Sequence, residues 1–334
     1  MKAEVTTARR RSFLRYANTA LKARIFNRKT PLLVSWVITR RCNFSCPYCQ
    51  SQGNEKEELT REQALDFVDR LARVGTQGVT LTGGEPLMRA DLGQIVDRCV
   101  ARGITVGVNS NGAMVEARIQ DIRNASMVML SLDGPENIHD AVRGPGSFAM
   151  VMRAVDLVRS RGIKVSIAAT LSSVNLSSLD AIFKIAREQE LRVYFQPAEK
   201  DQLRHDELNP ITPSVEEYRR AISAIMLEKT QNAYIGNSVS GLKYLYSWPD
   251  PHLPLKCYGG LLFVRVEANG DVKICGRHLG AAVMGNILKR DIMEIMKDAP
   301  PVVCTTCWSA ARLEFNKAMA FDLESVLTIL KKVK

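Results

Sequence analysis

Short apolar runs alternate with longer amphipathic stretches from residue 32 to residue 197, and this alternation restricts the fold more than any other feature. Short apolar runs predict buried strands, and apolar residues that repeat with the helical period predict helices. We expect strands at Leu33–Ile38, Gly78–Leu81, Thr105–Val108, Met127–Leu132, Lys164–Thr170 and Arg192–Phe195. We expect the helices between them at Arg61–Val74, Leu92–Ala101, Ala113–Asn124, Phe148–Ser160 and Ser178–Gln189. This order predicts an α/β fold with a parallel sheet and right-handed crossovers.

Three glycines mark the ends of these helices. Gly75, Gly103 and Gly162 each follow an amphipathic stretch and precede an apolar run. A residue in the left-handed conformation commonly ends a helix at this position. The strand–helix units number about six, fewer than the eight of a closed barrel. We therefore expect a partial (β/α)6 TIM-like barrel.

The pattern changes after residue 197, which divides the chain into regions. The pair Asn269-Gly270 lies between two apolar runs and predicts a β-hairpin of Leu261–Val266 with Val272–Cys275. Further helices are expected at Val215–Lys229, around Tyr244 and from residue 309 to the end. The expected regions are a basic amphipathic N-terminal helix (1–31), the barrel (32–200), a helical linker on the substrate side (201–256) and a small α+β unit with a C-terminal helix (257–334).

Positive charge is concentrated near the start of the chain. The formal net charge is +11, and residues 9–29 contain lysines and arginines without any acid. A solvated helix that packs by one face is the first interpretation, and a basic helix on an anionic membrane or an acidic partner is the second. No nucleic-acid-binding motif accompanies this charge. Since there is no bilayer-spanning apolar run and no signal peptide, we expect a cytoplasmic protein, with peripheral membrane contact through residues 9–29 as the second interpretation.

The chain has eight cysteines, and three of them form the motif Cys42-x3-Cys46-x2-Cys49 directly after an expected strand. A reducing compartment disfavours disulfides, so such cysteines indicate metal binding or catalysis. Three thiolates on one short loop suit an iron–sulfur cubane and leave its fourth iron open. Zinc is the alternative, although structural zinc sites usually have four ligands in paired spacings.

With Tyr48 before its third cysteine, this motif resembles the signature of the radical S-adenosylmethionine (SAM) superfamily. The resemblance implies that Cys42, Cys46 and Cys49 ligate three irons of a [4Fe–4S] cluster. It also implies that the amine and carboxylate of SAM chelate the fourth iron. Tyr48 is then expected beside the adenine.

Further candidates for cofactor binding follow the next strands. Ligands of open α/β sheets bind at the carboxyl ends of the strands, so these residues are expected on one face. They are Gly83, Gly84, Glu85, Asn109, Asn111, Ser131, Asp133 and Arg143, with Thr170 and Gln196 as weaker candidates. A tight turn explains the two glycines equally well, and a helix cap and a surface salt bridge explain Asp133 and Arg143. The resemblance implies that the Gly-Gly-Glu-Pro motif holds the SAM amine and that Arg143 meets the SAM carboxylate.

Four cysteines follow the barrel, namely Cys257, Cys275, Cys304 and Cys307. By themselves they suit zinc or a fully ligated [4Fe–4S] cluster equally well. The spacing Cys257-x12-Gly270-x4-Cys275 resembles the opening of the SPASM domain, and the number of cysteines is closer to its shortened "twitch" form. The resemblance implies a second, auxiliary [4Fe–4S] cluster whose four cysteines leave no iron open, and which therefore transfers electrons. The eighth cysteine, Cys99, lies in a helical pattern and is expected to be a buried apolar residue.

Taken together, the resemblance implies that the enzyme cleaves SAM reductively to a 5′-deoxyadenosyl radical, which abstracts hydrogen from a substrate C–H bond. We expect oxidative modification of a peptide or a carbohydrate-like small molecule, with the auxiliary cluster as electron acceptor. The implied electron donor is a protein of the flavodoxin or ferredoxin type. No residue stands out as a catalytic acid or base.

Three alternatives remain open. The basic N-terminal helix suits a radical SAM enzyme that modifies a lipid or isoprenoid. A non-catalytic zinc-binding barrel is a different class of protein altogether. A SAM methyltransferase or methylthiotransferase is disfavoured because the chain shows no cobalamin- or RNA-binding domain. The roughly 30 residues before the barrel are short for a leader-peptide-binding domain, which weakens the peptide hypothesis.

Overall fold

The computed structural model describes residues 21, 26–49, 57–198, 209–250, 255–276, 282–302 and 306–333. Strands and helices alternate through the first half as expected. The elements of this part are β1 (Leu33–Thr39), α2 (Arg61–Arg73), β2 (Gly78–Gly83), η1 (Pro86–Met88), α3 (Leu92–Ala101), β3 (Thr105–Ser110), α4 (Val115–Arg118), η2 (Ile119–Ile122), β4 (Met127–Ser131), α5 (Glu136–Arg143), α6 (Ser147–Ser160), β5 (Lys164–Leu171), η3 (Leu176–Ser178), α7 (Leu179–Glu188) and β6 (Arg192–Pro197).

The second half adds helices and a small antiparallel unit. Its elements are α8 (Val215–Gln231), α9 (Val239–Tyr246), β7 (Phe263–Val266), β8 (Asp271–Lys273), β9 (Gly285–Asn286), α10 (Ile292–Lys297), α11 (Ala310–Met319) and α12 (Leu323–Val333). The expected hairpin is present as β7 and β8, which pair antiparallel around Gly270, where φ is +89°. The single C-terminal helix that we expected is divided into α11 and α12, and Phe321 between them has a φ of +65°.

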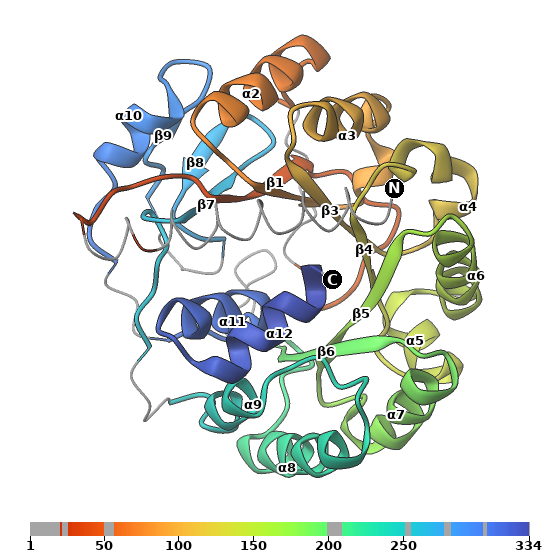
Figure 1. The fold of residues 1–334 in the computed structure, drawn as a ribbon. Helices are drawn as coiled ribbons and strands as arrows, with labels where there is room; N and C mark the ends of the chain where they lie inside the picture. Colours follow the sequence, from red (N-terminus) through yellow and green to blue (C-terminus); the bar gives the residue numbers. More distant parts are fainter. Residues whose placement is uncertain are drawn as a thin grey trace, which may run out of the picture.

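All nine strands form one sheet in the order β6-β5-β4-β3-β2-β1-β7-β8-β9. Strands β1 to β6 pair parallel, which confirms the expected α/β fold with an open, partial barrel. The sheet curves into an arc with most of its helices outside, whereas α11 and α12 lie on its inner side beside β6 (Figure 1). Strand β7 pairs parallel with β1, in the register Leu33↔Phe263 to Trp36↔Val266. The C-terminal hairpin therefore extends the barrel sheet rather than forming a separate one.

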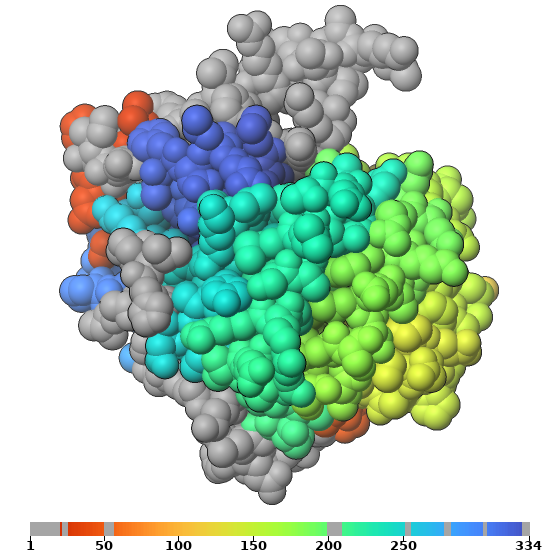
Figure 2. Space-filling model, turned by 90° about the horizontal axis from the view of Figure 1, so that it is seen from below, coloured from red at the N-terminus to blue at the C-terminus, as the bar shows by residue number. Residues whose placement is uncertain are grey.

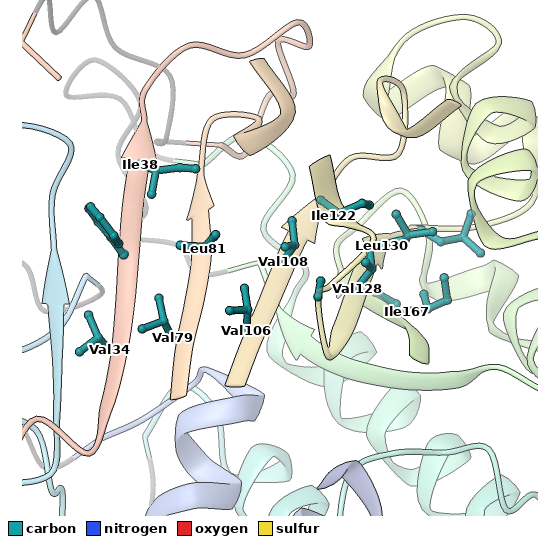
Figure 3. Close-up of a cluster of buried hydrophobic side chains, with 14 of the residues drawn as sticks. Val34, Ile38, Val79, Leu81, Val106, Val108, Ile122, Val128, Leu130 and Ile167 are labelled. Atoms are coloured by element: carbon teal, nitrogen blue, oxygen red, sulfur yellow. The ribbon is translucent and has the colours of Figure 1, made fainter. Parts of the chain in front are cut away.

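The core lies between the sheet and its outer helices. Valines on neighbouring strands meet in register, such as Val34 with Val79 and Val79 with Val106 (Figure 3). These side chains are at most 2% exposed, because the outer helices cover this face of the sheet. Trp36 packs edge-on against Phe67 of α2, with ring centroids 5.1 Å apart.

Glycines end three of the helices where the sequence predicted them. Gly75, Gly103 and Gly162 have φ values of +88°, +74° and +69°, a region that glycine enters without steric cost. Several short elements were not expected from the sequence, among them α5, α10, β9 and η1, and the pattern at 113–124 forms two short pieces instead of one helix.

The C-terminal helices are anchored to α9 by buried polar contacts. Ser238 donates its backbone N–H and its hydroxyl to Glu314 of α11, at 2.8 and 3.0 Å. Glu324 of α12 accepts the N–H of Val239 at 2.6 Å. In the space-filling view, the blue C-terminal helices lie directly against the cyan and green middle of the chain (Figure 2).

None of the described helices is both long enough and apolar enough to cross a membrane. Most of the basic segment 9–29 lies outside the described residues, so the membrane contact expected there stays a prediction.

Candidate active site

One cavity of about 710 Å³ collects most of the predicted site residues. It lies at the carboxyl ends of the parallel strands, where open α/β sheets bind their ligands. The predicted residues that line it are Cys42, Cys46, Tyr48, Cys49, Gly83, Gly84, Asn109, Asn111, Ser131, Arg143, Thr170, Gln196 and Cys275. Glu85, Asp133, Cys257 and Cys307 do not line it, and Cys304 lies outside the described residues.

The cysteine loop follows β1 and turns back on itself, with the N–H of Cys49 donating to the carbonyl of Cys46 at 3.1 Å. The sulfur of Cys42 accepts from the N–H of Phe44 at 3.5 Å and from the Nδ2 of Asn111 at 3.8 Å. Burial raises the pKa of Cys46 to about 11, although Arg143 opposes this shift. A thiol releases its proton to solvent when its sulfur binds a metal, and N–H groups aimed at sulfur suit the sulfur ligands of a cluster. The three cysteines therefore fit an iron–sulfur cluster by chemistry and placement.

Gly83 and Gly84 leave room for the backbone of the cysteine loop. A Cβ on Gly83 would lie 2.0 Å from the carbonyl oxygen of Thr39, and one on Gly84 would lie 2.1 Å from that of Arg41. The N–H groups of Gly84 and Glu85 donate to these two oxygens at 2.9 and 2.8 Å. The glycines are thus required to seat the loop, whether or not a ligand also approaches them.

Glu85, predicted to bind the cofactor, lies behind the cavity wall and is fully buried. Its carboxylate accepts the N–H of Asn111 at 2.7 Å, the hydroxyl of Ser110 at 2.9 Å and the N–H of Leu87 at 3.1 Å. These contacts join the end of β2 to the end of β3. Burial raises the pKa of Glu85 to about 7 despite these donors. These contacts give Glu85 a positioning role, and the ligand contact expected for it stays a prediction.

Tyr48, Asp133 and Arg143 form one buried polar cluster. Asp133 Oδ2 accepts the hydroxyl of Tyr48 at 2.8 Å and the Nε of Arg143 at 2.7 Å, and its Oδ1 accepts the N–H of Thr170 at 3.1 Å. Arg143 also donates through Nη2 to the Tyr48 hydroxyl. Burial alone would raise the pKa of Asp133, but the adjacent guanidinium holds it below its ordinary value. Asp133 therefore orients two side chains that line the cavity, and the cofactor contact expected for it stays a prediction.

His139 and Asn175 hold Asp133 from behind, and sequence reasoning gave them no defined role. His139 Nδ1 accepts the N–H of Asp133 at 3.1 Å, and Asn175 Nδ2 donates to the Asp133 carbonyl at 2.7 Å. The His139-Asp140 pair is visible in the sequence beside the Asp133 motif, whereas nothing in the sequence distinguishes Asn175.

Three of the four later cysteines gather near one another. The neighbouring thiols of Cys275 and Cys257 add to burial in raising the pKa of Cys307 to about 12. The N–H of Gly259 donates to the sulfur of Cys257 at 3.4 Å, and the N–H of Cys307 donates to the hydroxyl of Tyr244 at 3.2 Å. Because three thiols converge beside the cavity, this donor set also fits a cluster. Within the described ranges, no three Cys, His, Asp or Glu side chains are arranged to hold a single metal ion. Cys99 is fully buried in α3, as expected.

A basic part of the cavity wall was not foreseen. Arg40, Arg265, Lys273 and Arg312 line the cavity together with the buried carboxylate of Glu267. Arg265 and Glu267 flank Val266 at the end of β7, and that alternation is the only signal in the sequence that places them on one face.

Comparison with known proteins identifies the barrel. The model of the radical SAM superfamily matches residues 36–186. The AdoMet-dependent heme synthase of Oleidesulfovibrio alaskensis is 31% identical over 161 residues, which cover 46% of this chain and 42% of that protein. Mycofactocin maturase MftC of Mycolicibacterium smegmatis is 29% identical over 258 residues, covering 73% of this chain and 64% of that protein. The chain spans about half the length, or less, of the first curated relatives that it matches.

Solved structures share the fold. Streptococcus suis SuiB bound to S-adenosylmethionine aligns with a TM-score of 0.67 at 16% identity, over 84% of this chain and 69% of SuiB. Native anSMEcpe with bound AdoMet aligns with a TM-score of 0.62 at 18% identity, over 80% of this chain and 81% of that chain. None of the relatives named here favours the lipid-modifying or the zinc-binding alternative.

Proposed function

Residues 36–186 of this chain belong to the radical SAM superfamily, and from that premise we propose that the protein is a radical SAM enzyme that oxidises a C–H bond of a peptide or a small organic substrate. One observation carries this proposal: a single cavity is lined by all three cysteines of the first motif and by Cys275 of the second set. Two proteins with related folds or sequences support a peptide, since MftC is named a maturase and SuiB has been solved with its precursor peptide SuiA.

Cys42, Cys46 and Cys49 would hold a [4Fe–4S] cluster and leave its fourth iron to SAM. When bound, these groups supply one-electron cleavage of SAM to methionine and a 5′-deoxyadenosyl radical, which takes a hydrogen atom from the substrate. The chain itself provides orientation and protection from water.

Arg143 supplies the fixed positive charge of this part of the cavity. Its guanidinium is held by Asp133 through Nε, so the side chain cannot swing out of the wall. We assign it to the carboxylate of SAM, which an arginine fork matches well. Tyr48 lies under the same guanidinium, 5.6 Å from ring centroid to Cζ, and offers an aromatic face beside it. This supports its expected place near the adenine.

Cys257, Cys275 and Cys307, with Cys304 as the expected fourth ligand, would hold the auxiliary cluster, which supplies one-electron oxidation near the substrate. Strand pairing of β7 with β1 attaches this cysteine set to the barrel. An acidic electron donor of the flavodoxin or ferredoxin type suits a chain with a net charge of +11. No two of the described cysteines are joined by a disulfide, which suits a reducing compartment such as the cytoplasm.

The test is anaerobic reconstitution with iron and sulfide, followed by reduction with dithionite in the presence of SAM. We expect about eight irons per chain and formation of 5′-deoxyadenosine, detected by liquid chromatography. Cys46→Ala should abolish 5′-deoxyadenosine, whereas Cys99→Ala, a change of the same type inside α3, should leave it intact. Formation of 5′-deoxyadenosine by Cys46→Ala would contradict the proposal.

The second cluster has its own test. Cys275→Ala and Cys307→Ala should each lower the iron content from about eight to about four per chain and keep the absorbance of the first cluster. An unchanged iron content of about four in the wild type and in both variants would remove the second cluster from the proposal.

A further inference from the structure

The basic part of the cavity wall brings together side chains from four separate segments. Arg40 follows β1, Arg265 lies in β7, Lys273 ends β8 and Arg312 lies in the first turn of α11. All four line the cavity, and Glu267 is the only acidic residue among the described residues that line it. We call these four residues the basic wall.

Glu267 cannot balance the basic wall. Its carboxylate accepts from Arg40 Nη2 at 2.5 Å and from Arg265 Nε at 2.7 Å, and Lys273 Nζ lies 3.9 Å away. Among the described residues that line the cavity, one carboxylate therefore faces three cationic side chains before Arg312 is considered. Like charges crowded into a partly buried wall repel one another unless an anion lies among them. The wall is thus built for a further negative group.

Arg312 is the member with no acid of its own. In the described part of the chain no carboxylate lies within ion-pair distance of it, and its guanidinium stacks over the ring of Phe263 at 4.5 Å from the centroid. Stacking fixes the plane of the guanidinium and leaves its N–H edge for a partner. The Arg312 side chain is half-buried, so its surroundings differ from those of a fully solvated arginine.

The start of α11 adds donors at the same place. Ser309, Ala310 and Ala311 line the cavity together with Arg312. Ser309 is the N-cap, but its side chain makes no capping hydrogen bond. The first N–H groups of a helix have no partner within the helix and carry a partial positive charge. Ala310 and Ala311 place no long side chain between this helix start and the cavity that they line.

We propose that the basic wall binds a carboxylate of the substrate, with Arg312 and the start of α11 as the main contact and with Arg265 and Lys273 as secondary ones. This inference rests on the proposed function, because it assigns the substrate class of the same cavity. A carboxylate held there lies beside Cys275 and in the same cavity as Tyr48 and Arg143. The planar fork of arginine matches a carboxylate with two parallel hydrogen bonds.

A rival explanation is that the basic wall only balances the negative charge of the thiolates of the second cluster. Arg312 does lie near Cys307, where it opposes the rise in the pKa of that thiol. Arg40 and Arg265, however, contact Glu267, and all four basic side chains reach the cavity surface. The two explanations predict different effects of an Arg312 substitution on the affinity for a small anion.

The experiment measures binding of succinate to the reconstituted protein by anaerobic titration calorimetry at constant ionic strength. Succinamide, which has the same skeleton without charge, is the control ligand. We expect the wild type to bind succinate and not succinamide. We expect Arg312→Gln to lower the affinity for succinate at least about tenfold, which is the loss expected for one charge-assisted contact. Lys273→Gln should weaken it severalfold. Arg153→Gln, at an exposed arginine outside the cavity, should change it less than twofold.

Equal binding of succinate and succinamide by the wild type would overturn the inference. So would unchanged succinate affinity in Arg312→Gln, with or without a shift in the reduction potential of the second cluster, since that result assigns the basic wall to the cluster. If Arg312→Gln loses iron, the succinate affinity of Lys273→Gln alone tests the inference. The Lys273 side chain is 30% exposed, so its substitution should disturb the structure less. A wild type that prefers succinate but forms no 5′-deoxyadenosine would leave the carboxylate site standing and refute the proposed function instead.

Discussion

Asp133→Asn replaces one carboxylate oxygen by an NH2 group where both oxygens already accept hydrogen bonds. The donors are the Tyr48 hydroxyl at 2.8 Å, Arg143 Nε at 2.7 Å and the N–H of Thr170 at 3.1 Å. An asparagine offers a single acceptor oxygen, so it can satisfy Thr170 or the Tyr48–Arg143 pair but not both. In either orientation its NH2 group faces a donor.

The loss of charge is the larger effect. The side chains of Asp133 and Arg143 are 1% and 8% exposed, and Asp133 is the one carboxylate in ion-pair contact with Arg143 among the described residues. Removing one partner of a buried ion pair leaves an uncompensated charge, which typically costs about 3–5 kcal/mol. We expect Asp133→Asn to lower the free energy of unfolding by about that amount.

The assay is urea unfolding of the cluster-free protein under anaerobic, reducing conditions. The buried Trp36, Trp248 and Trp308 report unfolding by their fluorescence. Arg143→Met completes a double-mutant cycle, and we expect the double variant to lose several kcal/mol less than the two single losses combined. The control is Asp97→Asn, which breaks an ion pair with Arg123 whose side chains are 40% and 47% exposed, and which should cost less than about 1 kcal/mol. Additive losses, or a loss below about 1 kcal/mol for Asp133→Asn, would refute this reasoning.

Three further predictions follow from other parts of the structure. Gly84→Ala should displace the cysteine loop, since its Cβ would lie 2.1 Å from the Arg41 carbonyl oxygen, and should therefore lower the iron content of the first cluster. The control Gly107→Ala, whose Cβ would meet no atom closer than 3.7 Å, should retain its iron. Burial raises the pKa of Glu85 from 4.5 to about 7, so its contribution to stability is complete below about pH 4.5 and is lost as the pH rises through about 7. The difference in unfolding free energy between Glu85→Gln and wild type should therefore shift in favour of the variant between pH 5 and pH 8 in urea unfolding, and a constant difference would contradict this. Glu314→Gln should cost about 1–3 kcal/mol, because Oε1 accepts twice from Ser238 and a buried NH2 group would find no acceptor at Oε2; equal unfolding midpoints for wild type and variant would show that α11 is anchored by other contacts.

Strand positions were predictable because each barrel strand has one face buried against the outer helices. Such strands contain short apolar runs, and a glycine ends the helix before β2, β3 and β5. For β1, β2 and β3 the predicted and observed starts coincide at Leu33, Gly78 and Thr105. These three strands continue one or two residues further than predicted, and in β2 and β3 the added residues line the cavity. The predicted ends of these strands came too early because polar residues at a strand end have the composition of a loop.

The sequence could not distinguish side chains that face the ligand from side chains that support those facing it. Asp133 and Glu85 come shortly after strands at the cavity end, and the lining residues Asn109 and Ser131 lie in the last residues of theirs. What separates them is the direction of the side chain at the turn, which depends on acceptors and donors brought by other strands. The N–H of Asn111 fixes Glu85, and Thr170 on β5 fixes one oxygen of Asp133.

The basic wall was not predicted for a different reason, which is that its residues are far apart in the sequence. Arg40 and Glu267 are 227 residues apart in sequence and meet because β7 pairs with β1. That pairing has a second consequence. Val266 lies beside Trp36, so the hairpin that leads to Cys275 and the strand that leads to Cys42 run side by side in one sheet. The pairing of β7 with β1 therefore positions Cys275 relative to Cys42, and it brings Arg265 of β7 close to Arg40, which follows β1. A carboxylate bound at the basic wall would be positioned by the same sheet from which both cysteine-bearing segments extend.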